Sequence, residues 1–415
     1  MKILIVGNGG REHAIAWKTA QNPKVEKIYC APGNGGTALM DKCENIDIEQ
    51  IESLADFAEE NIVDLTIVGP EVPLVNGIVD YFKERDLKIF GPSKKAAALE
   101  GSKSFSKNFM KKYGVKTADY EVFYERDKAL EYLEVCNYPI VIKADGLAAG
   151  KGVVICENYS QAEDTITKFM VEDIFGDAGK KVVIEEFLVG VEASILSITD
   201  GQVILPFVSS KDHKQIYDED KGPNTGGMGA IAPNPYVTEE VMKEFNEKIL
   251  NPTLKGIKEE NFDYKGIIFF GVMITKNGAY LLEYNVRMGD PETQAVLPLM
   301  DSDLIELIEA SLNNELSSFD LKWKNSHSCC VVAVSKGYPG KYEKGFKINM
   351  PKEVHSFIAG GVFKGRNLLT NGGRVLCTYA VENNLEHSIK KAYEDMGKID
   401  FHGMYFRKDI GKLRY

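Results

Sequence analysis

The chain of 415 residues lacks an excess of basic residues. It contains 50 lysines and arginines against 61 aspartates and glutamates, which gives a formal net charge of -11 at pH 7. A protein that binds nucleic acid normally carries a basic excess, so the composition argues against that class of partner. A local cluster of positive charge can still attract small anionic substrates to an acidic protein.

The sequence also lacks long apolar runs and paired cysteine motifs. The first apolar run, Ile3 to Val6, is too short for a secretory signal, and no later run approaches the length of a membrane span. The seven cysteines are odd in number and include no Cys-x-x-Cys, and the adjacent Cys329 and Cys330 stand in an apolar run typical of a core strand. We therefore expect a cytoplasmic protein with reduced thiols that binds no membrane.

An intact dinucleotide fingerprint is missing from the first glycine turn. That motif needs G-x-G-x-x-G, and the chain has Gly7 and Gly9 but places Glu12 at the third glycine position. This disfavours a nicotinamide-dependent oxidoreductase. The turn lies between a short apolar strand and helical sequence, so we interpret it as an anion site at a helix N-terminus, with Arg11 and His13 as further donors. A tight turn without a ligand is the alternative.

A Walker-type phosphate loop is absent as well. The stretch from Asp145 to Gly152 has three residues, not four, between Gly146 and Gly150, and it leads into a strand instead of a helix. It is predicted to be a hairpin flap whose backbone N–H groups can approach phosphate oxygens, with Lys143 as a nearby point charge. A flexible surface hairpin without a ligand is the alternative.

What the first hundred residues do contain is a regular alternation of short apolar strands and helical segments. The strands are expected at residues 2–6, 28–30, 64–68 and 88–90, and each ends in a glycine turn. This pattern predicts a doubly wound parallel sheet. Ligands of such sheets collect at the carboxyl ends of the strands.

The stretch from Tyr280 to Glu292 is the strongest candidate for the chemistry, because side chains alternate between the faces of a strand. Its apolar face is predicted to hold Leu282, Tyr284, Val286 and Met288. Its polar face is predicted to hold Glu283, Asn285 and Arg287. Glu283 and Asn285 offer oxygen ligands for Mg²⁺ or Mn²⁺, and Arg287 offers a planar fork for a carboxylate or phosphate. An ordinary solvated strand face is the alternative, and the polar turn that follows favours a functional one.

Three further stretches carry candidate residues. Glu185 and Glu186 end a predicted strand that could hold a flat base, with Glu192 near enough to meet ribose hydroxyls. Residues 211–230 form a long irregular stretch rich in glycine, which is typical of a functional loop. Four lysines stud the predicted helix that ends at Tyr113, and most of them are expected to form a solvated basic face: Lys103, Lys107, Lys111 and Lys112.

Together these motifs resemble the glycinamide ribonucleotide synthetase (phosphoribosylamine–glycine ligase) family of the ATP-grasp superfamily. The resemblance covers nearly the whole chain and rests on Gly7 to Ala14, Lys143 to Gly152, Glu185 to Leu188, Asp212 to Lys214 with Gly222 to Ala230, and Arg287 to Thr293. It implies an α/β and α+β multidomain fold. The domains are a Rossmann-like parallel domain at 1–101, an ATP-grasp domain of two α+β lobes at 102–322 with its flap lobe at about 118–190, and a small α+β domain at 323–415.

The resemblance also implies the reaction. Glycine would be ligated to 5-phosphoribosylamine, with ATP converted to ADP and phosphate through glycyl phosphate, in de novo purine (IMP) biosynthesis. Another ATP-grasp carboxylate–amine ligase with a different acid substrate is the alternative. The implied partners are small molecules, with no nucleic acid and no membrane, and the expected state is a monomer.

Roles of individual residues follow from the same resemblance. ATP would meet Lys103, Lys143, Asp145, Gly146, Gly150, Gly152, Glu185, Glu186, Leu188 and Glu192. The other substrates would meet Gly9, Gly10, Arg11, Glu12, His13, Glu71, Asp212, Asn224, Thr225, Gly226, Gly227, Met228 and Arg287. The catalytic residues would be Lys143, Arg287 and Asp290, and the metal ligands Glu283 and Asn285. Two departures stand out: Gln215 replaces a common arginine, and the strand Ile268 to Ile274 lacks an acidic metal ligand.

Overall fold

In the computed structural model, which describes residues 1–148 and 152–413, the N-terminal domain is a parallel sheet in the order β3-β2-β1-β4-β5. Its strands are β1 (Lys2–Gly7), β2 (Lys27–Pro32), β3 (Cys43–Asn45), β4 (Leu65–Val68) and β5 (Ile89–Pro92). Its helices are α1 (Gly10–Thr19), α2 (Ile51–Glu60), α3 (Glu71–Asn76), α4 (Ile78–Glu84) and α5 (Lys94–Gly101). Helices cover both faces, which is why the strands read as continuous apolar runs. The predicted Rossmann-like sheet is confirmed.

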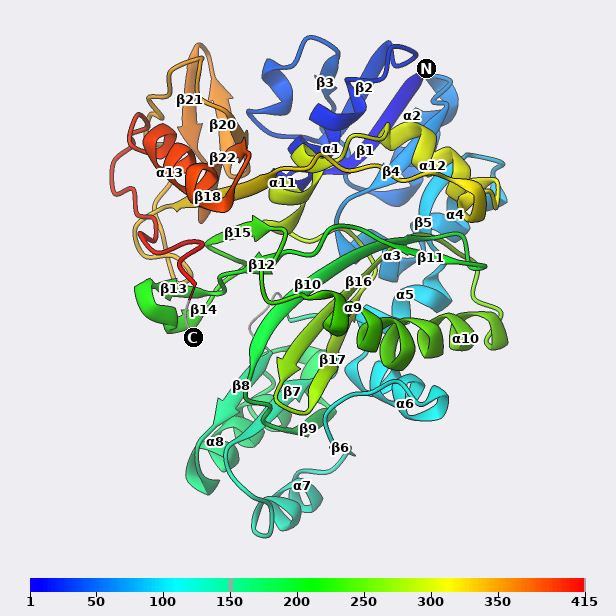
Figure 1. Cartoon of the computed structure of the whole chain (residues 1–415), viewed down its shortest axis with the longest axis vertical. Coiled ribbons are helices and arrows are strands. Elements are labelled where there is room, and N and C mark those ends of the chain that lie inside the picture. Colours follow the sequence, from blue (N-terminus) through cyan, green and yellow to red (C-terminus); the bar gives the residue numbers. More distant parts are fainter. Residues whose placement is uncertain (149–151, 414–415) are drawn as a thin grey trace.

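The same sheet continues without a break into the region predicted to be the ATP-grasp domain. Strand β5 pairs antiparallel with β16, where Pro92 lies opposite Tyr264 and Gly91 opposite Lys265. The added strands are β10 (Val191–Thr199), β11 (Ile204–Pro206), β16 (Tyr264–Thr275) and β17 (Gly278–Asn285). The accompanying helices are α6 (Lys103–Tyr113), α9 (Glu239–Phe245) and α10 (Asn251–Glu259). A single nine-stranded sheet therefore fixes the end of β17 relative to the N-terminal domain (Figure 1).

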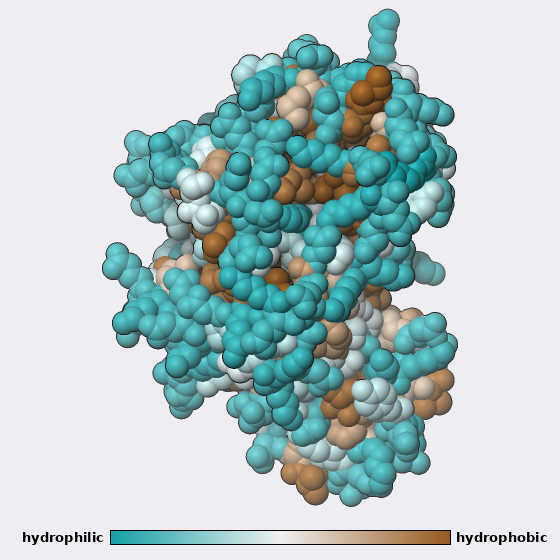
Figure 2. Space-filling view, turned by 90° about the vertical axis from the view of Figure 1, so that its right-hand side faces the viewer, coloured by the Kyte–Doolittle hydropathy of each residue, from teal (hydrophilic) through white to brown (hydrophobic). Residues whose placement is uncertain are grey.

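A small lobe, the predicted flap lobe, has its own sheet and its own hydrophobic core. It is a four-stranded antiparallel sheet in the order β6-β9-β7-β8, and Lys143 pairs with Val153 in the predicted hairpin. Its elements are β6 (Tyr120–Phe123), α7 (Arg126–Leu133), β7 (Ile140–Ala144), β8 (Val153–Cys156), α8 (Tyr159–Met170) and β9 (Val182–Glu186). Ile142, Ile166 and Ile184 are buried in its separate hydrophobic core. Figure 2 shows this lobe below the main body, on a face covered mostly by hydrophilic residues.

The C-terminal region is a five-stranded sheet in the order β12-β15-β18-β22-β19, with a helix against it. Its elements are β12 (Lys211–Asp212), β15 (Gly229–Ala232), β18 (His327–Val334), β19 (Ser356–Ile358), β22 (Arg374–Glu382) and α13 (Leu385–Met396). Two hairpins lie beside it: β13 (Gln215–Tyr217) with β14 (Lys221–Asn224), and β20 (Gly361–Lys364) with β21 (Asn367–Thr370). The connection from β17 contains α11 (Glu292–Val296) and α12 (Leu304–Leu312). Because β12 and β15 precede residue 322, this sheet crosses the domain boundary predicted there.

Two buried histidines attach the C-terminal backbone to the rest of the molecule. The Nδ1 atom of His13 accepts the N–H of Ile358 at 2.9 Å, and the Nε2 atom of His213 accepts the N–H of Gly411 at 3.1 Å. Burial lowers the pKa of each histidine to about 4. Both contacts need a neutral imidazole, because a protonated ring has no nitrogen left to accept.

None of the helices in the described ranges of the chain combines the length and the apolar character needed to cross a bilayer.

The histidines predict that stability falls as the pH falls. Each ring has a folded-state pKa of about 4 against an ordinary value of 6.5, so the unfolded chain binds more protons below neutral pH. The stabilisation is fully present above pH 6.5 and is lost toward pH 4, and at pH 5 the loss amounts to about 2 kcal/mol for each ring. Urea unfolding at pH 7.5 and 5.0 should show this loss. In His13→Gln the loss should be smaller by about that amount, whereas His387→Gln, on an exposed residue, should match the unmodified chain.

Candidate functional site

One cleft of about 490 Å³ lies between the flap lobe and the body, and residues from all three regions of the chain line it. The predicted site residues that line it are Arg11, Glu71, Lys103, Lys143, Gly146, Gly152, Glu185, Glu186, Leu188, Glu192, Asp212, Asn224, Thr225, Gly226, Glu283, Asn285, Arg287 and Asp290. Those that the structure places outside the lining are Gly9, Gly10, Glu12, His13, Asp145, Gly227 and Met228. Gly150 lies outside the described residues.

The polar face of β17 lines the cleft, but one residue departs from the predicted alternation. Gly271 of β16 pairs with Glu283, whereas its neighbour Val272 pairs with Leu281. This bulge leaves Leu282 without a partner on β16 and turns it to the side of Glu283. Leu281 is therefore buried in the core and Leu282 lines the cleft. The placement of Leu282 on the apolar face was wrong, while the burial of Tyr284, Val286 and Met288 is confirmed.

Glu283 and Asn285 form an oxygen-rich pair on the cleft wall. Burial alone would raise the pKa of Glu283, but Lys103, Lys214 and other cations of the cleft lower it to about 2. Within the described residues, no hydrogen bond or ion pair engages its carboxylate. Asn285 Oδ1 accepts Arg287 Nη2 at 3.2 Å. An ionised carboxylate beside a carboxamide fits a hard divalent cation. No cluster of three acidic, histidine or cysteine ligands occurs among the described residues, so water and substrate oxygens would complete the coordination.

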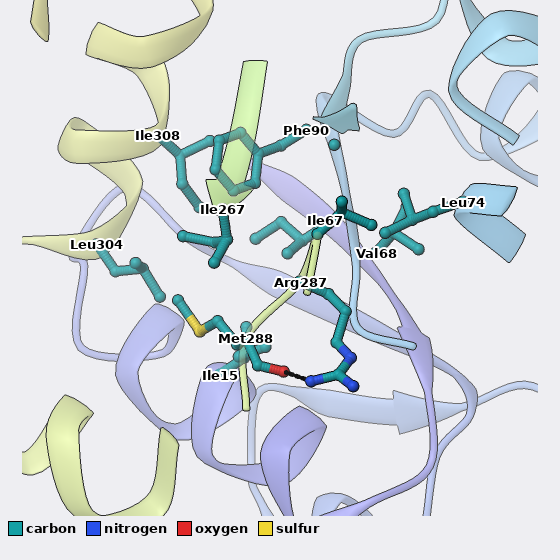
Figure 3. Close-up of a pocket in the computed structure, with 12 residues that line it drawn as sticks. Ile15, Ile67, Val68, Leu74, Phe90, Ile267, Arg287, Met288, Leu304 and Ile308 are labelled. Carbon is teal, nitrogen blue, oxygen red and sulfur yellow. Dashed lines mark hydrogen bonds between the residues drawn. The ribbon is translucent and has the colours of Figure 1, made fainter. Parts of the chain in front are cut away.

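Arg287 is held between two carboxylates at the end of this strand. Its Nε lies 3.2 Å from Glu71 Oε2, and its Nη2 lies 2.8 Å from Glu100 Oε1. Its Nη1 donates to the carbonyl of Met288 at 3.2 Å, as Figure 3 shows. A second cavity lies beside Arg287 and is lined mostly by apolar side chains such as Ile67 (Figure 3). Its volume of about 10 Å³ is too small for a substrate. Burial raises the pKa of Glu100 and Arg287 lowers it; the effect of burial is larger, so the pKa is raised.

A buried ion triad lies deeper in the cleft. Glu185 is 3% exposed, and it pairs with Lys107 at 3.0 Å and with Lys143 at 2.9 Å. Burial lowers the pKa of Lys107 to about 8, although Glu185 acts in the opposite direction. The expectation of a solvated lysine face was therefore wrong for Lys107. Its i, i+4 spacing from Lys103, which lines the cleft, is the sequence signal that could have placed it there.

Asp145 does not line the cleft but binds the N-terminus of helix α6. Its Oδ1 accepts the N–H of Ser104 at 2.6 Å and the hydroxyl of Ser102 at 3.0 Å, and its carbonyl accepts the N–H of Lys103 at 2.7 Å. A carboxylate at this position satisfies the free N–H groups of the α6 N-terminus. Asp145 therefore positions the helix start that carries Lys103.

The first glycine turn is filled by a carboxylate of the protein itself. Glu12 Oε2 accepts the N–H of Gly9 at 2.6 Å, and Glu12 Oε1 pairs with Arg11 Nε at 2.5 Å. Gly7 has a φ of +123°, and side chains at Gly7 or Gly69 would overlap Glu12. The interpretation of this turn as an external anion site with Arg11 and His13 as donors is not supported, because internal acceptors occupy Gly9 and Arg11, and the described contact of His13 Nδ1 is the one with the C-terminal backbone.

The expectation of one long irregular stretch at residues 211–230 was wrong, because backbone pairing forms the short strands β12, β13, β14 and β15 there. The segments between these strands still line the cleft. Gln215 replaces a common arginine of the family, but the preceding residue, Lys214, supplies a cation there and pairs with Glu192 at 2.6 Å. Burial and the nearby Glu292 raise the pKa of Asp212 well above its usual range. Gly227 has a φ of +111°, and a side chain there would meet Asp212 and Pro291, so only glycine fits.

Several lining residues received no role in the sequence analysis: Glu100 and Arg374 stand in no motif, and Lys214 and Glu292 lie in motifs that carry the resemblance but were not predicted to line the site. They reach the cleft through contacts between segments far apart in the chain: Glu100, Lys214, Glu292 and Arg374.

Comparison with protein families matches three domain models in order along the chain. The N domain of phosphoribosylglycinamide synthetase matches residues 1–100, its ATP-grasp (A) domain residues 101–293 and its C domain residues 328–413. Biotin carboxylases share the fold: that of the Hydrogenobacter thermophilus 2-oxoglutarate carboxylase has a TM-score of 0.75 over 97% of this chain and 91% of its own, at 16% identity. The fold and the cleft define an ATP-dependent ligase of the ATP-grasp class.

Closer relatives specify the family. The chain is 64% identical to the phosphoribosylamine–glycine ligase of Clostridium acetobutylicum, over 100% of both chains, and 54% identical to that of Fusobacterium nucleatum, over 100% of this chain and 99% of the relative. The crystal structure of the Thermotoga maritima phosphoribosylamine–glycine ligase has a TM-score of 0.86 and 34% identity, over 99% of this chain and 100% of that one. The chain belongs to the phosphoribosylamine–glycine ligase family.

The buried triad generates a prediction about stability. Lys107→Met keeps the volume of the side chain but leaves Glu185 with one cation, so the free energy of unfolding should fall by about 3 kcal/mol. Lys111→Met, on the exposed side of the same helix, should change it by about 0.5 kcal/mol or less. Urea unfolding followed by circular dichroism measures both. Equal stability of the two variants would contradict the triad.

Proposed function

We propose that the protein ligates glycine to 5-phosphoribosylamine and converts ATP to ADP and phosphate. The observation that carries the proposal is the full-length match to phosphoribosylamine–glycine ligases at 64% identity. The cleft supports it, because its lining combines cations, the oxygen-rich pair Glu283 and Asn285, and part of the loop of residues 225–228 between β14 and β15, which we call the glycine loop. The product, glycinamide ribonucleotide, belongs to purine biosynthesis.

The ATP end of the cleft lies between the flap lobe and β16. Apolar side chains from both sides offer a slot for a flat base: Val141, Ile155, Leu188, Met273 and Leu282. Glu186 and Glu192 stand at its polar rim. Lys103 and Lys143 would neutralise phosphate oxygens, and the backbone around Gly146 and Gly152 would cover them.

The metal is held, in this proposal, by Glu283 and Asn285. Their oxygen donors suit Mg²⁺ or Mn²⁺, which when bound neutralises phosphate charge and orients the transferred group. The salt links of Arg287 to Glu71 and Glu100 fix its guanidinium close to this pair, so it can meet an anionic group of the acceptor or of glycine.

The chemistry then needs two displacements. A carboxylate oxygen of glycine attacks the γ-phosphorus, the bond to the ADP oxygen breaks, and glycyl phosphate forms. The amine nitrogen of phosphoribosylamine attacks the carbonyl carbon, the C–O bond to phosphate breaks, and the nitrogen loses a proton as the amide forms. The chain contributes positioning and charge neutralisation.

We also infer a monomer that works in the cytoplasm. All seven cysteines are free thiols, five of them buried, which suits a reducing compartment.

ADP release tests the function directly. The protein should release ADP and phosphate when ATP, a divalent metal and phosphoribosylamine are present together with glycine, and only background amounts when glycine is omitted. Mass spectrometry should find glycinamide ribonucleotide in equal amount. ADP release with another amino acid but not with glycine would instead favour a different carboxylate–amine ligase.

Glu283 should be essential to turnover but not to folding. Glu283→Ala removes a metal ligand from the cleft wall, so kcat should fall roughly 10²- to 10³-fold, with an unfolding curve close to that of the unmodified chain. Glu121→Ala, at the one exposed position of strand β6, is the matched control and should retain full activity. Near-normal kcat in Glu283→Ala would argue against the metal assignment.

A further inference from the structure

The C-terminal domain reaches the cleft through Arg374, which the reaction above does not use. Arg374 is the first residue of β22, and its side chain is 21% exposed and lines the cleft. Its guanidinium contacts both the glycine loop, at Gly226, and the turn that follows β17, at Asp290. Arg374 therefore lies where these two loops of the ATP-grasp domain meet.

A single nitrogen of Arg374 binds both loops. Its Nη1 donates to the carbonyl of Gly226 at 2.6 Å and to the carbonyl of Asp290 at 2.7 Å, and it lies 3.0 Å from Asp290 Oδ1. Burial alone would raise the pKa of Asp290, but Arg374 and Arg11 hold it below its usual range. Charge-assisted bonds of this kind are stronger than neutral ones, so the two loops are tied at a fixed separation.

Other hydrogen bonds also hold Gly226 and Asp290 in place. The hydroxyl of Tyr338, also in the C-terminal domain, accepts the N–H of Gly226 at 2.9 Å. Both backbone polar groups of Gly226 are therefore held by that domain. On the other side, Gln294 Nε2 donates to Asp290 Oδ1 at 2.8 Å, and the N–H of Arg11 reaches Asp290 Oδ2 at 3.4 Å. Asp290, expected to be catalytic, thus has both carboxylate oxygens engaged within the protein.

We propose that Arg374 is a positioning residue, which holds the glycine loop against Asp290 at the end of the cleft where glycine and the amine react; this rests on the proposed function. Without the guanidinium, the carbonyl of Gly226 and the two oxygens of Asp290 repel one another and the loops separate. A displacement of about 1 Å at a reacting centre costs roughly 10²-fold in rate. The flap lobe, which bounds the proposed ATP end, lies far from β22 in the fold (Figure 1), so ATP binding should be spared.

The test measures kcat and the KM for each substrate in Arg374→Met, which keeps the volume but removes the donors. We expect kcat/KM for glycine to fall roughly 10²-fold, with KM for ATP within twofold of the unmodified enzyme, and partial recovery on adding guanidinium ion at concentrations far below those that unfold proteins. Arg366→Met, on an exposed residue of the β20–β21 turn, should leave every constant unchanged.

Each other outcome is decisive. Unchanged kcat/KM for glycine, or an equal loss for glycine and ATP without rescue, would overturn the positioning role. If Arg374→Met does not fold, Arg374→Lys decides, because its ammonium keeps the positive charge but on a shorter side chain than the guanidinium that holds both loops. It should lose kcat/KM for glycine at normal stability, and an unchanged kcat/KM would overturn the positioning role. The unmodified enzyme is assayed first: if it forms no glycinamide ribonucleotide, the proposed function fails, and that result is separate from any effect of the variants.

Discussion

Charge balance inside one cleft is the constraint on which the rest of the structure depends. Glu283 stays ionised inside the cleft because lysines and Arg287 surround it, although no ion pair within the described residues engages it directly. Glu185 stays ionised for a related reason, but Lys107 and Lys143 contact it directly. The first carboxylate is thus left available for a cation, while the second is neutralised by the protein. This difference supports the proposal that Glu283 is a metal ligand and indicates a structural part for Glu185.

The continuous sheet explains how charges from distant segments keep their places. Because β5 pairs with β16, the strands of the N-terminal domain and those of the ATP-grasp region belong to the same rigid sheet. Glu71 at the start of α3 and Arg287 after β17 can then meet at 3.2 Å although 216 positions separate them. The flap lobe has its own core, and its four described strands form a separate sheet, so it reaches the cleft as a distinct packing unit held to the body by contacts such as that of Asp145 with Ser104.

Local pattern was enough to predict the parallel sheet, the flap hairpin and the polar residues of β17, because each depends on residues close together in sequence. It failed where a contact between distant segments decides. The bulge that turns Leu282 into the cleft arises from pairing with β16, and the burial of Lys107 depends on Glu185. Arg374 carries no motif, and its role becomes visible only when Gly226 is placed beside it. Roles assigned by resemblance to the loop residues stay predictions.

The N-terminal domain shows how a carboxylate of the protein itself can occupy the glycine turn of a familiar fold. In a dinucleotide-binding domain, phosphate takes the N–H groups of the glycine turn. Here Glu12 supplies that negative charge from within and fills the space above Gly7 and Gly69. The carboxyl ends of the strands nevertheless still face the cleft, through Arg11 after β1 and Glu71 after β4. Because the Glu12 carboxylate accepts the N–H of Gly9, the turn is ordered without a bound anion. The domain can then form one side of a cleft whose other lining residues come mainly from other segments.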